Sequence, residues 1–211
     1  FEGADFIWEQ VNTGEVKLGC KNSVFTLPTP SLIGPHQIQN AALAAASVIY
    51  SNNFTPIDDR LFSGIEFAKW PGRVQFIDKG KLLHYRGAKP IWIDGAHNSH
   101  SATALAASLA KITGEKWTLI AGMLETRKPD DIFLPLKNLI SEIFTVTIPD
   151  QVASLSAQGL SERCQDLGIK ANAKSSLSEA LSATRESEFV VICGSLYLAG
   201  HAFILNDTPR E

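Results

Sequence analysis

The sequence predicts an α/β protein whose larger part is a mostly parallel sheet covered by helices on both faces. From residue 74 onward, short apolar segments alternate with segments whose apolar residues recur at helical spacing. The segment 189–193 is apolar throughout, which is typical of a strand buried on both of its faces. Residues 70–73, Trp-Pro-Gly-Arg, interrupt a helical pattern and separate this larger part from a smaller one before it.

The composition is that of a globular protein. The 211 residues are 45% apolar and 19% charged, which supplies a core and leaves too little charge for disorder. Lys and Arg total 19 against 22 Asp and Glu, a net charge of −3, so we expect neither a nucleic-acid partner nor a membrane surface. The apolar runs are far shorter than the roughly 18 residues that a membrane span needs.

Cysteine usage and charge also limit the compartment and the assembly. The three cysteines form no CxxC pair, which argues against a disulfide framework and a zinc site and favours a cytoplasmic protein. The near-neutral charge and ordinary apolar content require no partner subunit, so we expect a monomer. Because the chain starts at Phe1 and its one methionine is Met123, we also expect a piece of a longer protein.

The smaller part is predicted to contain a strand meander followed by helices. Residues 6–8, 16–18 and 24–27 are short β-branched or aromatic segments separated by Asn, Gly and Ser. Pro35 suits the first position of a helix, and a second helix is predicted over residues 57–67. The apolar residues of the first helix recur at helical spacing: Ile38, Ala42, Ala45 and Ile49.

In the larger part, strand-like apolar segments alternate with segments of helical apolar spacing. Strands are predicted over residues 91–93, 117–120, 143–148 and 189–193. Helices are predicted around Leu105, Leu109 and Ile112, over residues 132–140, around Leu160, Cys164 and Leu167, after Ser176, and over residues 196–205. Ser176 and Glu179 have the spacing of a capping box.

A first polar turn follows the strand at 91–93. In open parallel sheets, ligands bind outside the carboxyl ends of the strands, where Asp94 could contact a ribose or a cation and His97 a substrate. Alternatively, Asp94 and Asn98 only cap the next helix. His97 and His100 lie three residues apart, but no third ligand is evident, so we predict no metal site.

A second turn follows the strand at 189–193, and two further residues are candidates. Gly194 and Ser195 place backbone N–H groups and a hydroxyl at a helix start, where an anion could bind, although Ser195 could equally be only a helix cap. Arg73 could bind a phosphate, or it could be an ordinary surface arginine. Asn40 could pair its amide with a base edge, or it could be a solvated helix residue.

Two nucleotide-binding motifs are absent from the sequence. There is no GxxxxGK[ST] phosphate loop and no GxGxxG dinucleotide fingerprint. If the chain handles a nucleotide, it therefore does so without a phosphate cradle of its own.

Five motifs occur in one order: HQIQNAALAA (36–45), WPGR (70–73), WIDGAHN (92–98), AGML (121–124) and CGSLYLAG (193–200). Together they resemble the carboxyl-terminal half of folylpolyglutamate synthase, including its bifunctional dihydrofolate synthase form, in the Mur ligase superfamily. The resemblance implies that residues 1–69 are the tail of a central ATP-binding (ATPase) domain. It implies that residues 70–211 form a Rossmann-like Mur ligase C-terminal domain.

The resemblance also implies a reaction. In this family ATP phosphorylates the carboxylate of dihydropteroate or a folate, and the amine of L-glutamate attacks the resulting acyl phosphate. ATP and Mg²⁺ are the implied cofactors, with the magnesium ligands in an amino-terminal part that this chain lacks. The implied partners are the small-molecule substrates, and we expect the 211 residues alone to be inactive.

Motif by motif, the resemblance implies roles for five residues. Asn40 resembles the residue that contacts adenine, Arg73 the one that contacts the phosphates, and Asp94 the one that contacts the ATP ribose. His97 resembles the essential catalytic histidine near the incoming glutamate, and Ser195 the serine that helps to hold that glutamate. The loop ETRKPDD (125–131) departs from the acidic-basic-acidic triplet that is frequent in the family, so we assign it no role.

Two other interpretations stay open at this point. A peptidoglycan-type Mur ligase would share the architecture and the mechanism, although the residues of the motifs WPGR and GSLY favour the folate branch. A non-enzymatic Rossmann-like binding module would share only the fold.

Overall fold

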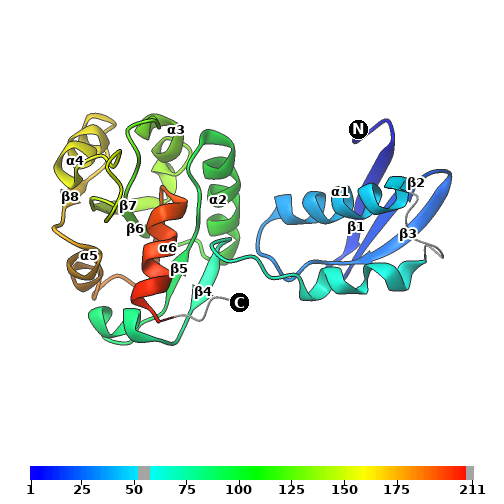
Figure 1. Cartoon of the computed structure of the whole chain (residues 1–211), viewed down its shortest axis with the longest axis horizontal. Helices are drawn as coiled ribbons and strands as arrows, with labels where there is room; N and C mark the ends of the chain where they lie inside the picture. Colours follow the sequence, from blue (N-terminus) through cyan, green and yellow to red (C-terminus); the bar gives the residue numbers. More distant parts are fainter. Residues whose placement is uncertain (52–57, 208–211) are drawn as a thin grey trace. The chain divides into compact units, whose positions relative to one another are not determined.

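The computed structural model describes residues 1–51 and 58–207, which form two compact units (Figure 1). Unit 1 is Phe1–Trp70 and unit 2 is Pro71–Glu211. The assignment of residues 1–69 to an ATP-binding domain and of residues 70–211 to a Mur ligase C-terminal domain stays a prediction.

Unit 1 contains a three-stranded antiparallel sheet in the order β1-β2-β3. Its elements are β1 (Phe6–Asn12), β2 (Glu15–Cys20), β3 (Ser23–Pro28), α1 (Pro35–Ser51) and the 3₁₀-helix η1 (Asp59–Phe67). The three predicted strands are confirmed, and α1 begins at Pro35 as expected. The second predicted helix is confirmed from Asp59, whereas residue 57 lies outside the described residues.

The core of unit 1 lies between α1, η1 and one face of this sheet. The four apolar residues predicted for the inner side of α1 are all buried: Ile38, Ala42, Ala45 and Ile49. They pack with Leu18 and Leu27 of the sheet and with Phe62 of η1. The small alanines let the helix backbone approach the sheet closely, and the branched residues fill the space between them.

Unit 2 contains a six-stranded sheet in the order β4-β5-β9-β6-β7-β8. Its strands are β4 (Gln75–Ile77), β5 (Ile91–Ile93), β6 (Trp117–Ala121), β7 (Ile140–Thr145), β8 (Ala171–Ala173) and β9 (Val190–Cys193). Every neighbouring pair is parallel except β4 with β5. The predicted α/β fold with a mostly parallel sheet is confirmed.

Helices cover both faces of this sheet (Figure 1). They are η2 (Lys81–Arg86), α2 (Ser99–Ile112), α3 (Pro129–Phe133), η3 (Lys137–Leu139), α4 (Ala157–Asp166), α5 (Leu177–Ala183) and α6 (Leu196–Leu205). Leu119 of β6 packs in one core with α2, α3 and α4, whereas the next residue, Ile120, packs in the other core with η2, α5 and α6. Among the helices of residues 1–51 and 58–207, none combines the length and apolar character needed to cross a membrane.

The helix predicted over residues 132–140 is wrong as one continuous helix. α3 ends at Phe133, the 3₁₀-helix η3 occupies Lys137–Leu139, and Ile140 is already the first residue of β7, which ends at Thr145 rather than at residue 148. Pro135 contributes to the break, because it has no backbone N–H to donate to the preceding turn. The three-residue strands β4 and β8 were not predicted, because each contains a polar residue, Gln75 or Asn172, whereas the equally short β5 is apolar throughout.

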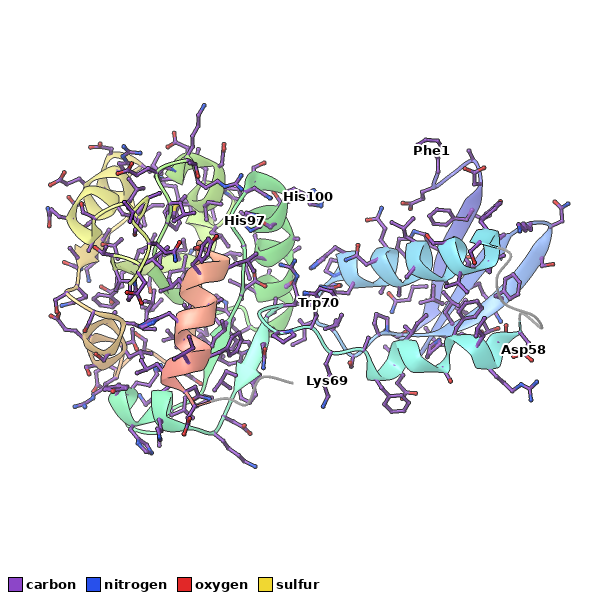
Figure 2. The ribbon with its side chains drawn as sticks, in the orientation of Figure 1. Phe1, Asp58, Lys69, Trp70, His97 and His100 are labelled. Atoms are coloured by element: carbon purple, nitrogen blue, oxygen red, sulfur yellow. The ribbon has the colours of Figure 1, made fainter. Side chains whose placement is uncertain are left out.

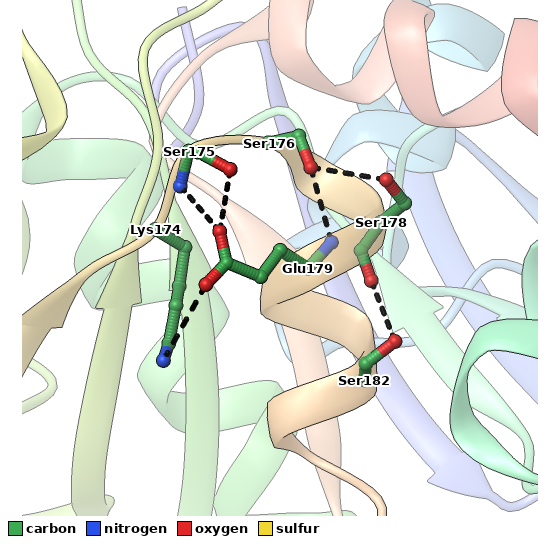
Figure 3. Close-up of polar contacts among 6 residues, drawn as sticks. All are labelled: Lys174, Ser175, Ser176, Ser178, Glu179 and Ser182. Carbon is green, nitrogen blue, oxygen red and sulfur yellow. Dashed lines mark hydrogen bonds and ion pairs between the residues drawn. The ribbon is translucent and has the colours of Figure 1, made fainter.

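The predicted capping box at α5 forms in a shifted arrangement (Figure 3). Ser176 Oγ accepts a hydrogen bond from the Glu179 N–H at 3.2 Å, as a cap should. The Glu179 carboxylate, however, accepts from the backbone N–H of Ser175 at 2.8 Å and from the Ser175 hydroxyl, one residue before the cap. The helix start is therefore stabilised by two serines instead of one.

A buried arginine connects the amino ends of β5 and β9. The guanidinium of Arg86 donates to the Thr184 hydroxyl and carbonyl, both at 3.3 Å, to the Ser187 carbonyl at 2.7 Å and to the Pro90 carbonyl. Pro90 directly precedes β5, and Ser187 lies just before β9. Burial lowers the pKa of Arg86 to about 10, which leaves it charged at neutral pH.

Replacing this arginine should strongly destabilise unit 2. Arg86→Met leaves buried carbonyls without a donor, so we expect the free energy of unfolding to fall by at least about 3 kcal/mol. Urea unfolding followed through the indole NMR signals of Trp92 and Trp117 measures this loss. Arg163→Met is the control, because Arg163 is exposed on α4 of the same unit and its replacement should cost no more than about 0.5 kcal/mol. Equal losses in the two variants would contradict the role of Arg86.

Candidate functional site

Three strands of unit 2 end side by side at one edge of the sheet. Ile93 of β5 lies beside Ile192 of β9, and Cys193 of β9 lies beside Ala121 of β6, each in parallel pairing. We call this edge, with the turns that follow β5, β9 and β6, the carboxyl edge. The turns at 94–97 and 194–195 therefore lie next to each other.

The chain leaves the carboxyl edge in opposite directions from neighbouring strands. The turn after β5 leads to α2, which packs on one face of the sheet, and the turn after β9 leads to α6, which packs on the other. Such a reversal is the switch point at which open α/β sheets bind ligands.

Backbone contacts join these turns directly. The Gly194 N–H donates to the Ala96 carbonyl at 2.9 Å, and the Asp94 N–H donates to the Ile192 carbonyl at 2.9 Å. Gly194 has a φ of 102°, and a Cβ atom there would lie 2.8 Å from the Gly122 carbonyl oxygen of the turn after β6. The turns therefore pack backbone against backbone, and glycine is required at residue 194.

Asp94 lies at the centre of this arrangement. Its side chain is buried, with Oδ2 accepting from the Val74 N–H at 2.8 Å and Oδ1 from the Ala96 N–H at 2.7 Å. Burial raises the pKa of this carboxyl group, against the lowering effect of the two N–H donors and of the nearby Arg73 and His97. Asp94 does not cap α2, so that alternative is wrong for this residue.

Asn98 is the residue that caps α2. Its side chain accepts from the Ser101 N–H at 2.9 Å, and the Ser101 hydroxyl in turn receives the Asn98 N–H at 3.1 Å. This reciprocal box fixes where the helix starts and therefore where the preceding residue, His97, stands.

His97 is half-buried just before the start of α2 (Figure 2). Its Nδ1 lies 2.8 Å from the Gly95 carbonyl oxygen, and its backbone N–H donates to the Ser101 hydroxyl at 3.0 Å. Because a carbonyl oxygen only accepts, Nδ1 carries the proton, and Nε2 of the neutral ring holds the lone pair. His97 is thus oriented to accept a hydrogen bond or a proton at Nε2.

Ser195 is buried and caps α6. Its Oγ accepts from the Tyr197 N–H at 3.1 Å, so the capping alternative describes what the structure shows. The cap also places Ser195 beside the first N–H groups of a ten-residue helix, where partial positive charge accumulates. The predicted contact with glutamate stays a prediction.

Arg73 and Asn40 belong to different units. Arg73 is half-buried in unit 2, and its guanidinium forms no hydrogen bond or ion pair within residues 1–51 and 58–207. Asn40 is exposed on α1 of unit 1, and its Nδ2 donates to the buried Gln37 Oε1 at 3.2 Å. Four of the five predicted residues are therefore in unit 2, whereas Asn40 is in unit 1.

Sequence reasoning missed Val74, whose N–H binds Asp94. Val74 has a φ of 44°, a left-handed conformation that is a genuine outlier for a β-branched residue. A single sequence cannot indicate a valine in this conformation, because the backbone preferences of β-branched residues all disfavour a positive φ.

A metal site built by protein side chains needs several donors close together. Within residues 1–51 and 58–207, no group of three or more His, Cys, Asp or Glu side chains could hold a metal ion.

The sequence of unit 2 matches a known family. Residues 83–205 match the family model described as dihydrofolate synthetase, C-terminal domain. The chain belongs to this family. The match includes the turns after β5, β6 and β9, so the carboxyl edge lies within the part of the chain that defines the family.

Named relatives and solved structures agree with the family. The dihydrofolate synthase/folylpolyglutamate synthase of Bacillus subtilis is 28% identical over 179 residues, which cover 79% of this chain and 38% of the relative. The Mycobacterium tuberculosis folylpolyglutamate synthase complexed with ADP and AMPPCP has a TM-score of 0.79 and 23% identity, over 100% of this chain and 50% of that one.

A second solved structure gives the same result. The Yersinia pestis bifunctional folylpolyglutamate synthase/dihydrofolate synthase, complexed with AMPPNP and a Mn ion, has a TM-score of 0.78 and 23% identity, over 96% of this chain and 46% of that one. These structures share the fold of both units. The chain spans half or less of the length of these proteins.

Adding a side chain at residue 194 should disrupt the carboxyl edge. Gly194→Ala combines a left-handed backbone with a Cβ clash against a carbonyl oxygen, so we expect a loss of about 2 kcal/mol or more in the free energy of unfolding. Gly200→Ala in α6 is the matched control, because its Cβ meets nothing within 4 Å and alanine favours a helix. Urea unfolding decides, and a Gly194→Ala variant as stable as the control would contradict the packing argument.

Proposed function

We propose that this chain is the carboxyl-terminal part of a cytoplasmic, monomeric ligase that joins L-glutamate to dihydropteroate or a folate at the expense of ATP. The observation that carries the proposal is the carboxyl edge of a chain in this family, which gathers Arg73, His97 and Ser195 in one unit. The relatives named as folylpolyglutamate and dihydrofolate synthases support the substrate class.

Arg73 is suited to the phosphates of ATP. Arg73 is half-buried, and its guanidinium forms no direct ion pair with a described residue, so its N–H donors could bond to an incoming anion. Phosphoryl transfer to a carboxylate spreads negative charge over the transferred group, and a planar guanidinium can hold two of its oxygens at once. Asn40 would supply an amide to the adenine edge. The ribose contact of Asp94 stays a prediction.

His97 and Ser195 are suited to the amino-acid substrate. An amine that attacks an acyl phosphate must lose a proton, and Nε2 of His97 holds the lone pair that can take it. The N–H groups that begin α6, next to Ser195, favour a carboxylate of the same substrate. One helix start and one imidazole would thus orient the two ends of the amino acid.

Magnesium would be a cofactor of the whole ligase. The described residues offer no group of three or more His, Cys, Asp or Glu side chains that could hold it, so its protein ligands would lie outside this chain. ATP would bring the metal with its phosphates.

The 211-residue chain alone should release no ADP in the presence of dihydropteroate, L-glutamate, ATP and magnesium. The reason is that its sequence lacks a phosphate loop, whereas the complete gene product that contains the chain should turn over with all four components. A coupled ADP assay with each component omitted in turn measures this. Turnover by the chain alone would contradict the proposal that the active site needs a phosphate loop outside this chain. Turnover only with a nucleotide-linked sugar would favour a peptidoglycan-type ligase.

Removing the imidazole of His97 should impair turnover more than stability. In the complete gene product, His97→Ala should lower kcat about 100-fold or more, while the free energy of unfolding changes by less than about 1 kcal/mol. His100→Ala is the control, because His100 is exposed in the first turn of α2, three residues after His97, and its replacement should leave kcat unchanged. If His97→Ala unfolds the protein but spares the activity of each folded molecule, the residue is structural.

A further inference from the structure

We propose that Ser101 is a positioning residue for His97 and that its hydroxyl acts through the backbone on both sides of that histidine. Ser101 Oγ accepts from the His97 N–H at 3.0 Å and from the Asn98 N–H at 3.1 Å. The same hydroxyl donates to the Asn98 carbonyl at 2.9 Å. The inference rests on the proposed function, because His97 receives its role as a base there.

The hydroxyl supplies an acceptor that the helix itself cannot provide. His97 and Asn98 come just before α2, so their N–H groups have no carbonyl of that helix to bond to. Side chains of a helix tilt toward its amino end, which is how the Ser101 hydroxyl reaches back to both groups. The alternative acceptor for half-buried N–H groups is water, which imposes no fixed direction on them.

The two bonds hold both peptide groups that flank the Cα atom of His97. The His97 N–H belongs to the peptide group before this Cα, and the Asn98 N–H belongs to the one after it. Because one oxygen binds both, the backbone angles of His97 are restrained together. The direction in which the imidazole leaves the backbone is therefore set by Ser101.

The ring is restrained at a second point. Its Nδ1 lies 2.8 Å from the Gly95 carbonyl oxygen, and the Gly95 N–H in turn donates to the Gly72 carbonyl at 2.8 Å. The bond to Gly95 sets the tautomer and the rotation of the ring, whereas Ser101 sets where the ring starts. Both restraints are needed to give Nε2 one position.

The hydroxyl of Ser101 has no capacity left for a ligand. A serine hydroxyl has one proton and two lone pairs, and its three bonds to His97 and Asn98 use all of them. The cap of α2 is a different contact, in which Asn98 Oδ1 accepts from the backbone N–H of Ser101 at 2.9 Å. Removing the hydroxyl therefore releases the two peptide groups and leaves this cap in place.

The test is a double-mutant cycle in the complete gene product. Ser101→Ala should lower kcat about tenfold, less than the roughly 100-fold that a misplacement of about 1 Å can cost, because Gly95 still orients the ring. In the His97→Ala background, the same substitution should change kcat less than about twofold, since no imidazole is left to position. A purely structural role predicts the same loss in both backgrounds, and that result would overturn the proposal.

Three further variants separate the hydroxyl from the helix. Ser101→Thr keeps the hydroxyl and should hold kcat within about threefold of the wild-type value, whereas Ser101→Val replaces it with a methyl group and should match Ser101→Ala. Ser108→Ala is the control, because its hydroxyl donates to the Ala104 carbonyl at 2.8 Å further along the same helix, and it should leave kcat unchanged. Equal kcat values for the Thr and Val variants would contradict the role of the hydroxyl.

Amide hydrogen exchange on the 211-residue chain tests the same contacts without catalysis. In the wild type, the amides of His97 and Asn98 should be protected, and in Ser101→Ala their exchange should accelerate about tenfold or more while β6 amides stay unchanged. Unprotected amides in the wild type would overturn the proposal even if the variant fails to fold. If the gene product shows no glutamate-dependent turnover at all, the proposed function fails, and the exchange measurement still decides whether Ser101 holds both peptide groups.

Discussion

The carboxyl edge depends on one buried carboxylate. Asp94 accepts hydrogen bonds from the N–H of Val74, 20 residues before it, and from the N–H of Ala96, 2 residues after it. Its carboxylate therefore connects the start of unit 2 to the turn after β5. That turn is tied in turn to the one after β9 through the Gly194 N–H and the Ala96 carbonyl. A buried charge is costly unless it is hydrogen-bonded. Backbone arrangements in which Asp94 loses these two N–H donors are therefore strongly disfavoured.

Close backbone approach is the second condition. Gly194 touches the turn after β6, and a Cβ at Gly95 would meet the side chain of Leu196 at the start of α6. Where backbones approach this closely, their N–H and C=O groups can bond to each other without competition from side chains. The polar groups of Arg73 and His97 remain partly exposed, and a ligand could therefore use them.

Much of the fold could be predicted from the sequence, because its periods are clear. The three strands of unit 1, the inner side of α1 and the bounds of α6 all follow from apolar spacing. One error arises where Pro135 breaks the helical spacing of apolar residues after α3. The others arise at β4 and β8, which are short and contain polar residues, so their apolar pattern is weak.

The candidate site could be predicted only in part. The order of the motifs indicated five candidate residues, and strand pairing shows that two of the turns adjoin. The partners of Asp94 could not be predicted, since they depend on a left-handed valine that no local preference favours. Asn98, not Asp94, caps α2, although both residue types suit that position equally.

The two ends of the unit 2 sheet use buried charge differently. At the amino ends of β5 and β9, Arg86 bonds only to carbonyl and hydroxyl oxygens that belong to the fold, so its charge serves stability alone. At the carboxyl edge, both carboxylate oxygens of Asp94 accept hydrogen bonds from backbone N–H groups. The Arg73 guanidinium has no ion pair among the described residues. A direct Asp94–Arg73 pair would stabilise the fold but would occupy the cation that an anionic substrate needs. By bonding to the neighbours of Arg73 and His97 instead, the carboxylate can fix both residues while their side chains stay available.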